Sequence, residues 1–414
     1  EAAGHLRIAE NCNVFGFRLS GCVWESDHAG SGCNETGNWM SQEHEVMPLE
    51  LFFDLVFAFA VSQLSQHLLA HLSWRGVAET LVMLLAIFAV WFRTSWSATM
   101  VPADQPRTLW MMLAVMLLGL FMNAAVTAAF TTSGWAFVVP YLLIQLGRTL
   151  WTYFNAPDAV YREHYLRVFV WLIPTSLLWI AGAAVNSDSR LLWWGLAAGI
   201  DLIGSWLAHP VPGRHLQSEN VSFDASHMLE RCRLFLLIAL GETILTTGTA
   251  IAEVPMTRMT LVTGTAALAG TVSLWALNFG HSRRLSLRYR EETHDPIRLS
   301  RHAVNALIGL FAGLIAVAVG NELVIAHPDG EASSTLSLLL YGGPIVYLLA
   351  QRWYLRTVPG DSTRLRLIGS FALALAGLFT LPAPPYVALT TVAASLAILA
   401  MLDHRRLNQV QSRM

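Results

Sequence analysis

The sequence predicts an all-α protein, a polytopic integral membrane bundle of about 12 transmembrane helices. Of its 414 residues, 54% are hydrophobic and 13% are charged, and the mean hydropathy is +0.48. Soluble domains carry about 25% charged residues. The chain also contains twelve apolar windows, and a helix needs about 20 such residues to cross about 30 Å of hydrocarbon. The alternating pattern of membrane strands is not found.

The twelve windows are separated by polar or charged loops. They cover residues 48–72, 76–100, 108–131, 134–155, 166–185, 190–209, 229–252, 257–280, 302–325, 335–356, 365–382 and 384–402. Pro140, Pro174 and Pro344 fall inside windows and predict kinks, which membrane helices tolerate when neighbouring helices satisfy the freed carbonyl groups. The last two windows flank the Pro-rich sequence LPAPPY, which predicts a turn at the membrane surface.

Three regions are expected along the chain. They are an N-terminal tail (1–46), a transmembrane domain (47–402, with halves of about 47–210 and 227–402) and a cytoplasmic C-terminal tail (403–414). The stretch MSQEHEVMPLELFFD from Met40 reads like a natural start. Residues 1–39 are therefore expected to be upstream sequence or a disordered tail.

Short similarities between the halves suggest an internal repeat. LLGLF at 117–121 recurs as LIGLF at 307–311, and Trp91 has a counterpart in Trp275. The first helix of each half also begins with a glutamate. Six helices per half would relate the halves by an axis along the membrane normal, so the sequence predicts two parallel six-helix repeats.

Arginines predict the orientation in the membrane, because cytoplasmic loops carry an excess of basic residues. The chain has 26 basic residues, all arginine, and twenty of them fall on one side of the predicted bundle. Three fall on the other side: Arg75, Arg190 and Arg258. We expect a multi-pass protein of the bacterial inner membrane with both termini in the cytoplasm.

Few charged residues lie inside the windows, and each costs about 3 kcal/mol near mid-membrane unless it is paired or hydrated. Glu50 and Asp54 are one turn apart on one face of the first helix. Either Glu50 favours the positive helix N-terminus while Asp54 pairs with a basic group, or the two form a cation or proton entry site. Arg148 and Asp201 either form a buried pair, or Asp201 lines an aqueous path.

The seventh helix begins HMLERCRLFLLIALGETIL. Its His227-x-x-Glu230 spacing can place two metal ligands on one face, but one pair is too few and Arg231 repels cations, so no metal site is predicted. Glu242 lies about 18 Å beyond Glu230, well inside the membrane. It is either a ligand or proton site, or a buried acid that is ion-paired or hydrogen-bonded. His209, at a window end, is expected to meet solvent or lipid headgroups.

Partners and cofactors follow from motifs and charge. The net charge of −2 and the lack of a nucleic-acid motif argue against nucleic-acid binding. Phosphate loops, nucleophile elbows and dinucleotide fingerprints are not found, so no cofactor and no catalytic residue are predicted. The basic segment 281–301 is expected to attract anionic membrane lipids. A homo-oligomer is left open.

Two segments resemble the signature sequences of the bacterial low temperature requirement protein A (LtrA) family. They are PLELFFDLVFAFAVSQL (48–64) and HMLERCRLFLLIALGETIL (227–245), within a resemblance that spans roughly residues 47–325. The motif positions carried over are Glu50, Phe53, Asp54, His227, Glu230, Phe235, Gly241 and Glu242. The chain departs from the family pattern at Asn278 and after the second helix, where only Asp104 and Arg107 are charged. The resemblance implies a membrane architecture and supplies no substrate.

Three functions remain open. The first is a transporter or channel-like permease for a small solute or ion, with Asp54, Glu242 and Asp201 along the path. The second is a membrane enzyme acting on a lipid-type substrate, with Glu230 and His227 as acid and base. The third is a structural or assembly protein in which the buried charges fix helix packing.

Overall fold

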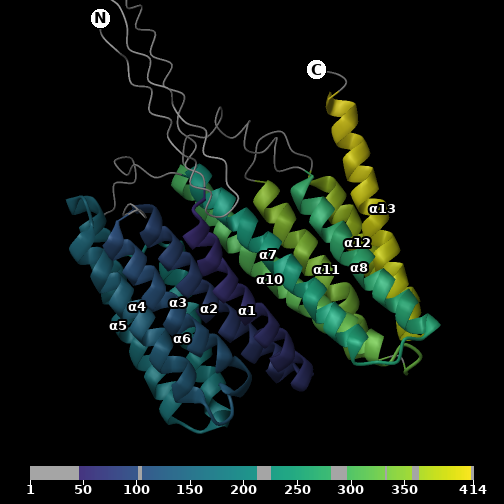
Figure 1. Cartoon of the computed structure of the whole chain (residues 1–414), viewed down its shortest axis with the longest axis horizontal. Coiled ribbons are helices and arrows are strands. Elements are labelled where there is room, and N and C mark those ends of the chain that lie inside the picture. The colour runs from purple at the N-terminus through teal and green to yellow at the C-terminus, as the bar shows by residue number, and fades with distance from the viewer. Residues whose placement is uncertain are drawn as a thin grey trace, which may run out of the picture. The chain divides into compact units, whose positions relative to one another are not determined.

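The computed structural model describes residues 46–100, 105–211, 225–280, 296–331, 333–356 and 363–411. Over these residues the chain forms twelve α-helices and one short 3-10 helix, with no strand (Figure 1). Nine of the described helices are long and apolar enough to cross a membrane. The predicted all-α membrane bundle is therefore confirmed.

The helices follow the predicted windows closely. The first six are α1 (Pro48–Ala70), α2 (Trp74–Met100), α3 (Pro106–Ala124), α4 (Gly134–Asn155), α5 (Ala159–Ala184) and α6 (Ser187–Trp206). The next six are α7 (Ala225–Ala252), α8 (Arg258–Phe279), α10 (Pro296–Ala326), α11 (Ser334–Leu355), α12 (Arg364–Phe379) and α13 (Pro385–Gln411). The window 108–131 is interrupted, since α3 ends at Ala124 and the 3-10 helix η1 (Val126–Ala128) follows.

The same helix pairs pack in both sets of six. In the first set α1 packs on α2 and α3, α2 packs on α6, and α3 to α6 pack successively. In the second set α7 packs on α8 and α10, α8 packs on α13, and α10 to α13 pack successively. The two sets meet mainly where α1 of the first set packs on α7 and α10 of the second (Figure 1). This recurrence supports the six-helix repeat that the short sequence similarities suggested.

Close packing and polar contacts hold the helices together, because lipid offers no hydrophobic drive between them. A Cβ added to Gly313 of α10 would lie 2.7 Å from the carbonyl oxygen of Gly343 on α11, so only glycine allows this approach. Between α4, α5 and α6 the rings of Tyr141, Trp179 and Trp194 pack with centroids 4.8–5.4 Å apart. Large apolar side chains such as Phe371 remain exposed, as expected of a surface that faces lipid.

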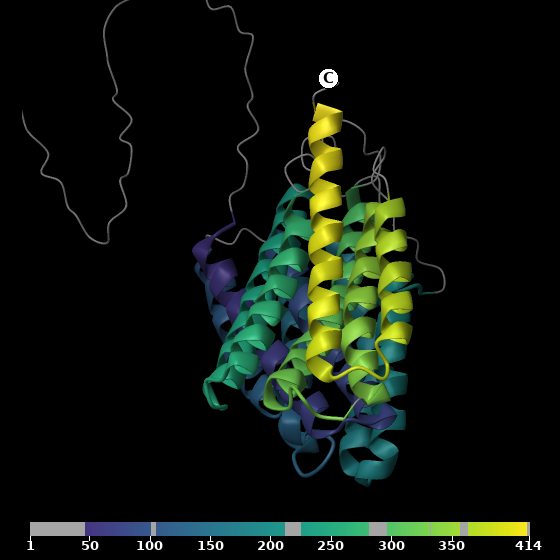
Figure 2. The same ribbon diagram turned by 90° about the vertical axis from the view of Figure 1, so that its right-hand side faces the viewer.

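Several helices extend beyond their apolar windows. α7 begins at Ala225, α10 begins at Pro296, and α13 continues to Gln411, running past the other helices beside it in Figure 2. The expected C-terminal tail from residue 403 is therefore largely helical, and Asp403 is buried. The predicted N-terminal tail, the junction between the halves and most of the basic segment 281–301 lie outside the described residues.

Candidate functional site

The first candidate site joins the opening helices of the two halves. We call it the α1–α7 charge cluster, formed by Glu50, Asp54, Trp91, His227 and Arg231. Arg231 Nη2 donates to Asp54 Oδ1 at 2.7 Å, and its Nη1 donates to Glu50 Oε1 at 3.4 Å. Glu50 Oε1 also lies 3.1 Å from His227 Nε2, and Trp91 Nε1 donates to Asp54 at 2.7 Å. The contacts advance along both helices in the same direction, so α1 and α7 run parallel.

The α1–α7 charge cluster is dry and tightly enclosed. The side chains of Arg231 and Asp54 are both 0% exposed. The Arg231 guanidinium lies over the rings of Phe53 and Trp91, and Trp91 stacks on Phe235 with centroids 4.4 Å apart. This geometry agrees with the alternative in which Asp54 pairs with a basic group while Glu50 lies at the helix N-terminus, where it accepts from the Met47 backbone N–H.

Glu230 and Glu242 lie elsewhere on α7. Glu230 forms an ion pair with Arg233 at 3.2 Å, while His227 contacts Glu50, so the two predicted acid–base residues have separate partners. Glu242 is half-buried in the middle of α7. It lies eleven residues, or about 16 Å, beyond Arg231 along the helix. Asp54 and Glu242 therefore do not converge. No group of three metal-ligating side chains occurs among the residues that the structure describes.

The second candidate site is a cavity of about 140 Å³, which we call the α2–α10 cavity. It is lined by residues of α2, α4, α5 and α6, by the segment directly after α6, and by α10 of the second half. Its charged and histidine side chains are Arg93, Arg148, His164, Asp201, His209 and Arg301. The cavity thus lies where α10 of the second half meets the helices of the first.

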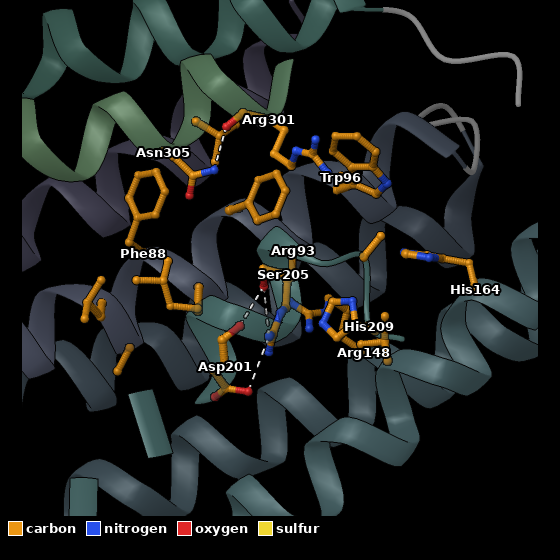
Figure 3. Close-up of a pocket in the computed structure, with 18 of the residues that line it drawn as sticks. Phe88, Arg93, Trp96, Arg148, His164, Asp201, Ser205, His209, Arg301 and Asn305 are labelled. Atoms are coloured by element: carbon orange, nitrogen blue, oxygen red, sulfur yellow. Dashed lines mark hydrogen bonds and ion pairs between the residues drawn. The ribbon is translucent and has the colours of Figure 1, made fainter. Parts of the chain in front are cut away.

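Asp201 is the predicted acid that lines this cavity. Arg93 Nη2 lies 3.4 Å from both Asp201 Oδ1 and Ser205 Oγ, and the Tyr141 hydroxyl donates to Asp201 Oδ2 at 3.1 Å. Figure 3 shows Arg93 directed at Asp201, with Arg301 and Asn305 of α10 above them in the view. The ion pair of Asp201 is with Arg93 on α2, and the predicted pair with Arg148 is not formed.

Arg148 is held by uncharged acceptors instead. Its Nη2 donates to Gln145 Oε1 at 2.6 Å, and its Nη1 lies 3.3 Å from Thr94 Oγ1 and 3.4 Å from the Val90 carbonyl oxygen. Only 2% of the residue is exposed. A buried arginine without a paired carboxylate is costly in a membrane, which makes this region a candidate functional site.

Several buried donors around the cavity have no hydrogen-bond partner among the described residues. The arginine donors are Arg93 Nε and Nη1 and Arg148 Nε, and the histidine ring nitrogens, donor or acceptor according to tautomer, are His164 Nδ1 and both nitrogens of His209. The great majority of buried polar groups in native proteins are hydrogen-bonded. These atoms are buried, so a bound molecule reaches them only when neighbouring side chains shift, and it then breaks no hydrogen bond that they make among the described residues.

The backbone at the cavity is strained. Ala208 and His209, which follow α6 and line the cavity, have φ angles of 57° and 55°. Such left-handed conformations are unfavourable for residues other than glycine and cluster at functional sites. The expectation that His209 faces solvent or headgroups is wrong, because the residue is only 7% exposed.

Sequence reasoning missed Arg93, His164 and Asn305. Arg93 is one of the twenty arginines counted on the cytoplasmic side, although it stands well inside the window 76–100. Its position seven residues before the end of α2 was the available signal. His164 lies five residues after the start of α5 and Asn305 nine residues after the start of α10, and no sequence signal separates them from ordinary interfacial residues.

Comparisons with known proteins agree with the motif resemblance. Residues 45–401 match the family model described as bacterial low temperature requirement A protein (LtrA). The chain is also 29% identical over 338 residues to a protein of Rhizobium meliloti (strain 1021) that is named as uncharacterized. That alignment covers 80% of this chain and 82% of the relative. No solved structure matches the chain.

Proposed function

Since the chain belongs to the bacterial low temperature requirement A (LtrA) family, we propose that it is a permease of that family. It acts as a transporter or channel for a small solute or ion, and the solute path passes through the α2–α10 cavity. We place it in the bacterial inner membrane with both termini in the cytoplasm, as the arginine distribution predicts.

The observation that carries this proposal is the contrast between two kinds of buried charge. Arg231 with Asp54, and Arg366 with Asp403, form enclosed ion pairs between helices. The α2–α10 cavity instead combines buried charges with open volume. Unpartnered polar atoms occur at both places, since Asp54 Oδ2 and Arg231 Nε also lack a partner among the described residues, so the open volume carries the contrast. Ionisable residues that face an internal cavity of a membrane bundle mark substrate and ion pathways.

The four predicted path acids have different roles in this proposal. Asp201 is the path residue, because it lines the cavity and orients Arg93. Asp54 and Glu50 fix α1 against α7 through Arg231. Glu242 does not line the cavity.

The cavity's position suits alternating access. Most of its wall belongs to helices of the first half, whereas Arg301, Val304, Asn305 and Ile308 belong to α10 of the second half. A small movement of α10 relative to α2 and α6 would therefore open or close it. Transporters built from two repeats bind their substrates at such an interface and rock one half against the other.

Flux in proteoliposomes tests the proposal. We expect protein-dependent movement of at least one member of a panel containing rubidium, chloride, phosphate, benzoate and glycerol. Ala89→Phe fills the cavity wall and should reduce this flux at least tenfold. Ala269→Phe, at an exposed position on α8, is the matched control and should leave it unchanged. Equal flux through Ala89→Phe and the unchanged protein would refute a path through the cavity.

A structural or assembly role is the second candidate, and the enclosed ion pairs favour it. In that case neutralising Arg93 or Arg148 would lower stability as much as neutralising Arg231 does. The permease proposal expects a smaller loss at the two cavity arginines, because functional sites are commonly optimised for activity at some expense in stability. Thermal unfolding of the purified variants distinguishes the two roles.

A further inference from the structure

We infer that the α2–α10 cavity recognises a small organic anion, with a carboxylate or phosphate group held by Arg93 and Arg148 and a compact apolar body. This inference rests on the proposed permease function and names its substrate class. It differs from the expectation drawn from the sequence, in which intramembrane acids would bind a cation or a proton.

The charge balance of the cavity favours an anion. Three arginines line it against one aspartate, Asp201. Arg93 is 7% exposed and Arg148 2% exposed, so water cannot fully solvate either guanidinium. A cation entering this space would meet a surplus of positive charge in a medium of low dielectric constant, where like charges repel strongly.

The unpartnered donors show where the anionic group binds. Asp201 and Ser205 occupy Arg93 Nη2, which leaves Arg93 Nε and Nη1 without acceptors among the described residues. Arg148 Nε is likewise unpartnered. Guanidinium groups bind carboxylates and phosphates through such paired N–H donors. One oxyanion between the two arginines would therefore satisfy donors that otherwise remain buried at a cost.

The histidines extend the same binding surface. His164 Nδ1 and both ring nitrogens of His209 are buried and unpartnered among the described residues, and the two rings lie 6.1 Å apart. In the close-up His209 lies near Arg93 (Figure 3). A neutral imidazole offers one donor and one acceptor, so His209 can bind a protonated or hydroxyl-bearing part of the same ligand.

The remaining wall and the volume define the body of the ligand. Apolar side chains from three helices form much of the wall, among them Leu85, Phe88, Phe92, Val168 and Ile308. The volume of about 140 Å³ is close to that of an engineered apolar cavity of about 150 Å³ that binds benzene. Benzoate, a benzene ring with one carboxylate, therefore matches both the charge and the size.

Asp201 separates an anion site from a cation site. If a cation binds, Asp201 is its counter-charge and Asp201→Asn abolishes binding. If an anion binds, Asp201→Asn removes a repulsive charge while the amide oxygen can still accept from Arg93. Because like charges repel strongly where the dielectric constant is low, we expect Asp201→Asn to strengthen anion binding on the order of tenfold.

The test is equilibrium binding of benzoate to the full-length protein in detergent, measured by isothermal titration calorimetry. Benzamide is the neutral probe of the same shape, inorganic phosphate lacks the apolar body, and rubidium is the cation. Variants are Arg93→Gln, Arg148→Gln, Asp201→Asn and Ala89→Phe. Arg233→Gln is the matched control, because it also removes one arginine charge but lies on α7 outside the cavity, where Arg233 pairs with Glu230.

We expect benzoate to bind at least tenfold more tightly than benzamide or phosphate. Arg93→Gln, Arg148→Gln and Ala89→Phe should each weaken binding at least tenfold, and Asp201→Asn should strengthen it. Arg233→Gln should have no effect. Equal affinity for benzoate and benzamide, loss of binding in Asp201→Asn, or preference for rubidium would overturn the inference. Asp201→Asn and Ala89→Phe keep the test decisive if an arginine variant does not fold.

Native mass spectrometry of the purified protein separates two sources of the anion. A copurified anionic phospholipid that benzoate displaces shows that a lipid supplies the group, and its absence together with benzoate binding indicates a soluble acid.

The binding and flux experiments test the two proposals separately. Benzoate binding without flux of any solute would refute the permease proposal but support the anion site. Flux without benzoate binding would support the permease proposal but refute the anion site.

Discussion

Breaking the ion pair between Arg231 and Asp54 should destabilise the whole bundle, because it joins the first helices of the two halves. The two side chains are 0% exposed and their charged atoms lie 2.7 Å apart. Removing one partner of a buried ion pair costs about 3–5 kcal/mol, since the other charge is left uncompensated. In the Asp54→Asn variant, Arg231 still forms its ion pair with Glu50 at 3.4 Å. We therefore expect a loss of unfolding free energy at the lower end of this range, about 3 kcal/mol.

Arg231→Met should cost more, about 4–5 kcal/mol, because both Glu50 and Asp54 then lose their guanidinium. The double variant leaves no unpaired charge at residue 54 or 231. We therefore expect it to cost about 2–3 kcal/mol less than the sum of the two single variants.

The assay is unfolding by sodium dodecyl sulfate in mixed micelles, followed by tryptophan fluorescence, with the free energies extrapolated to zero denaturing detergent. Glu242→Gln is the control on the same helix, at a half-buried position, and should change stability by less than about 0.5 kcal/mol. If both single variants cost less than about 1 kcal/mol and their effects add, the cluster does not hold the halves together.

Three further predictions concern individual positions, each measured by unfolding of purified variants. Asp403→Ala removes the carboxylate that faces the buried Arg366 guanidinium and should cost about 3 kcal/mol, and a loss below about 1 kcal/mol would contradict the enclosed pair. Gly313→Val should cost at least about 2 kcal/mol, because its Cβ would meet the α11 backbone at 2.7–2.9 Å, and an unchanged midpoint would refute that close approach. Ala208→Gly should raise stability by about 0.5–1 kcal/mol by relieving the φ of 57°, whereas destabilisation would show that Ala208 is not strained.

Hydropathy predicted the helices well and their ends poorly. The window 134–155 coincides with α4, because short polar or Pro-containing stretches, TTS at 131–133 and APD at 156–158, border the apolar residues on both sides. α7 and α10 begin four and six residues before their windows, at Ala225 and Pro296. Helical hydrogen bonding continues into the water layer wherever propensity and capping allow it, and hydropathy carries no information about that continuation.

Ion-pair partners could not be predicted from the sequence. Spacing alone placed Glu50 and Asp54 on one face of α1, and the structure confirms that both face Arg231. The partner of Asp201 depends on which helix packed against α6 carries an arginine at the level of Asp201 along the bundle. α2 does so through Arg93, because α2 packs on α6. That choice depends on tertiary packing, so the alternative that paired Asp201 with Arg148 was wrong.

The cavity itself was beyond sequence reasoning, because its walls come from five helices of both halves. Each wall residue alone resembles an ordinary interfacial or core residue. His209 shows the difficulty most clearly. Its position at a window end suggested exposure, whereas the left-handed turn after Trp206 folds it back into the bundle.

Accessibility of a cysteine at position 89 tests most directly whether the α2–α10 cavity lies on a path across the membrane. The background protein has Cys12, Cys22, Cys33 and Cys232 replaced by serine, and Ala60→Cys in the dry core is the unreactive control. Ala89→Cys should react with an anionic, membrane-impermeant methanethiosulfonate added to either side of proteoliposomes, and benzoate should slow the reaction. Reaction from one side only, or from neither, would contradict a permease path through this cavity.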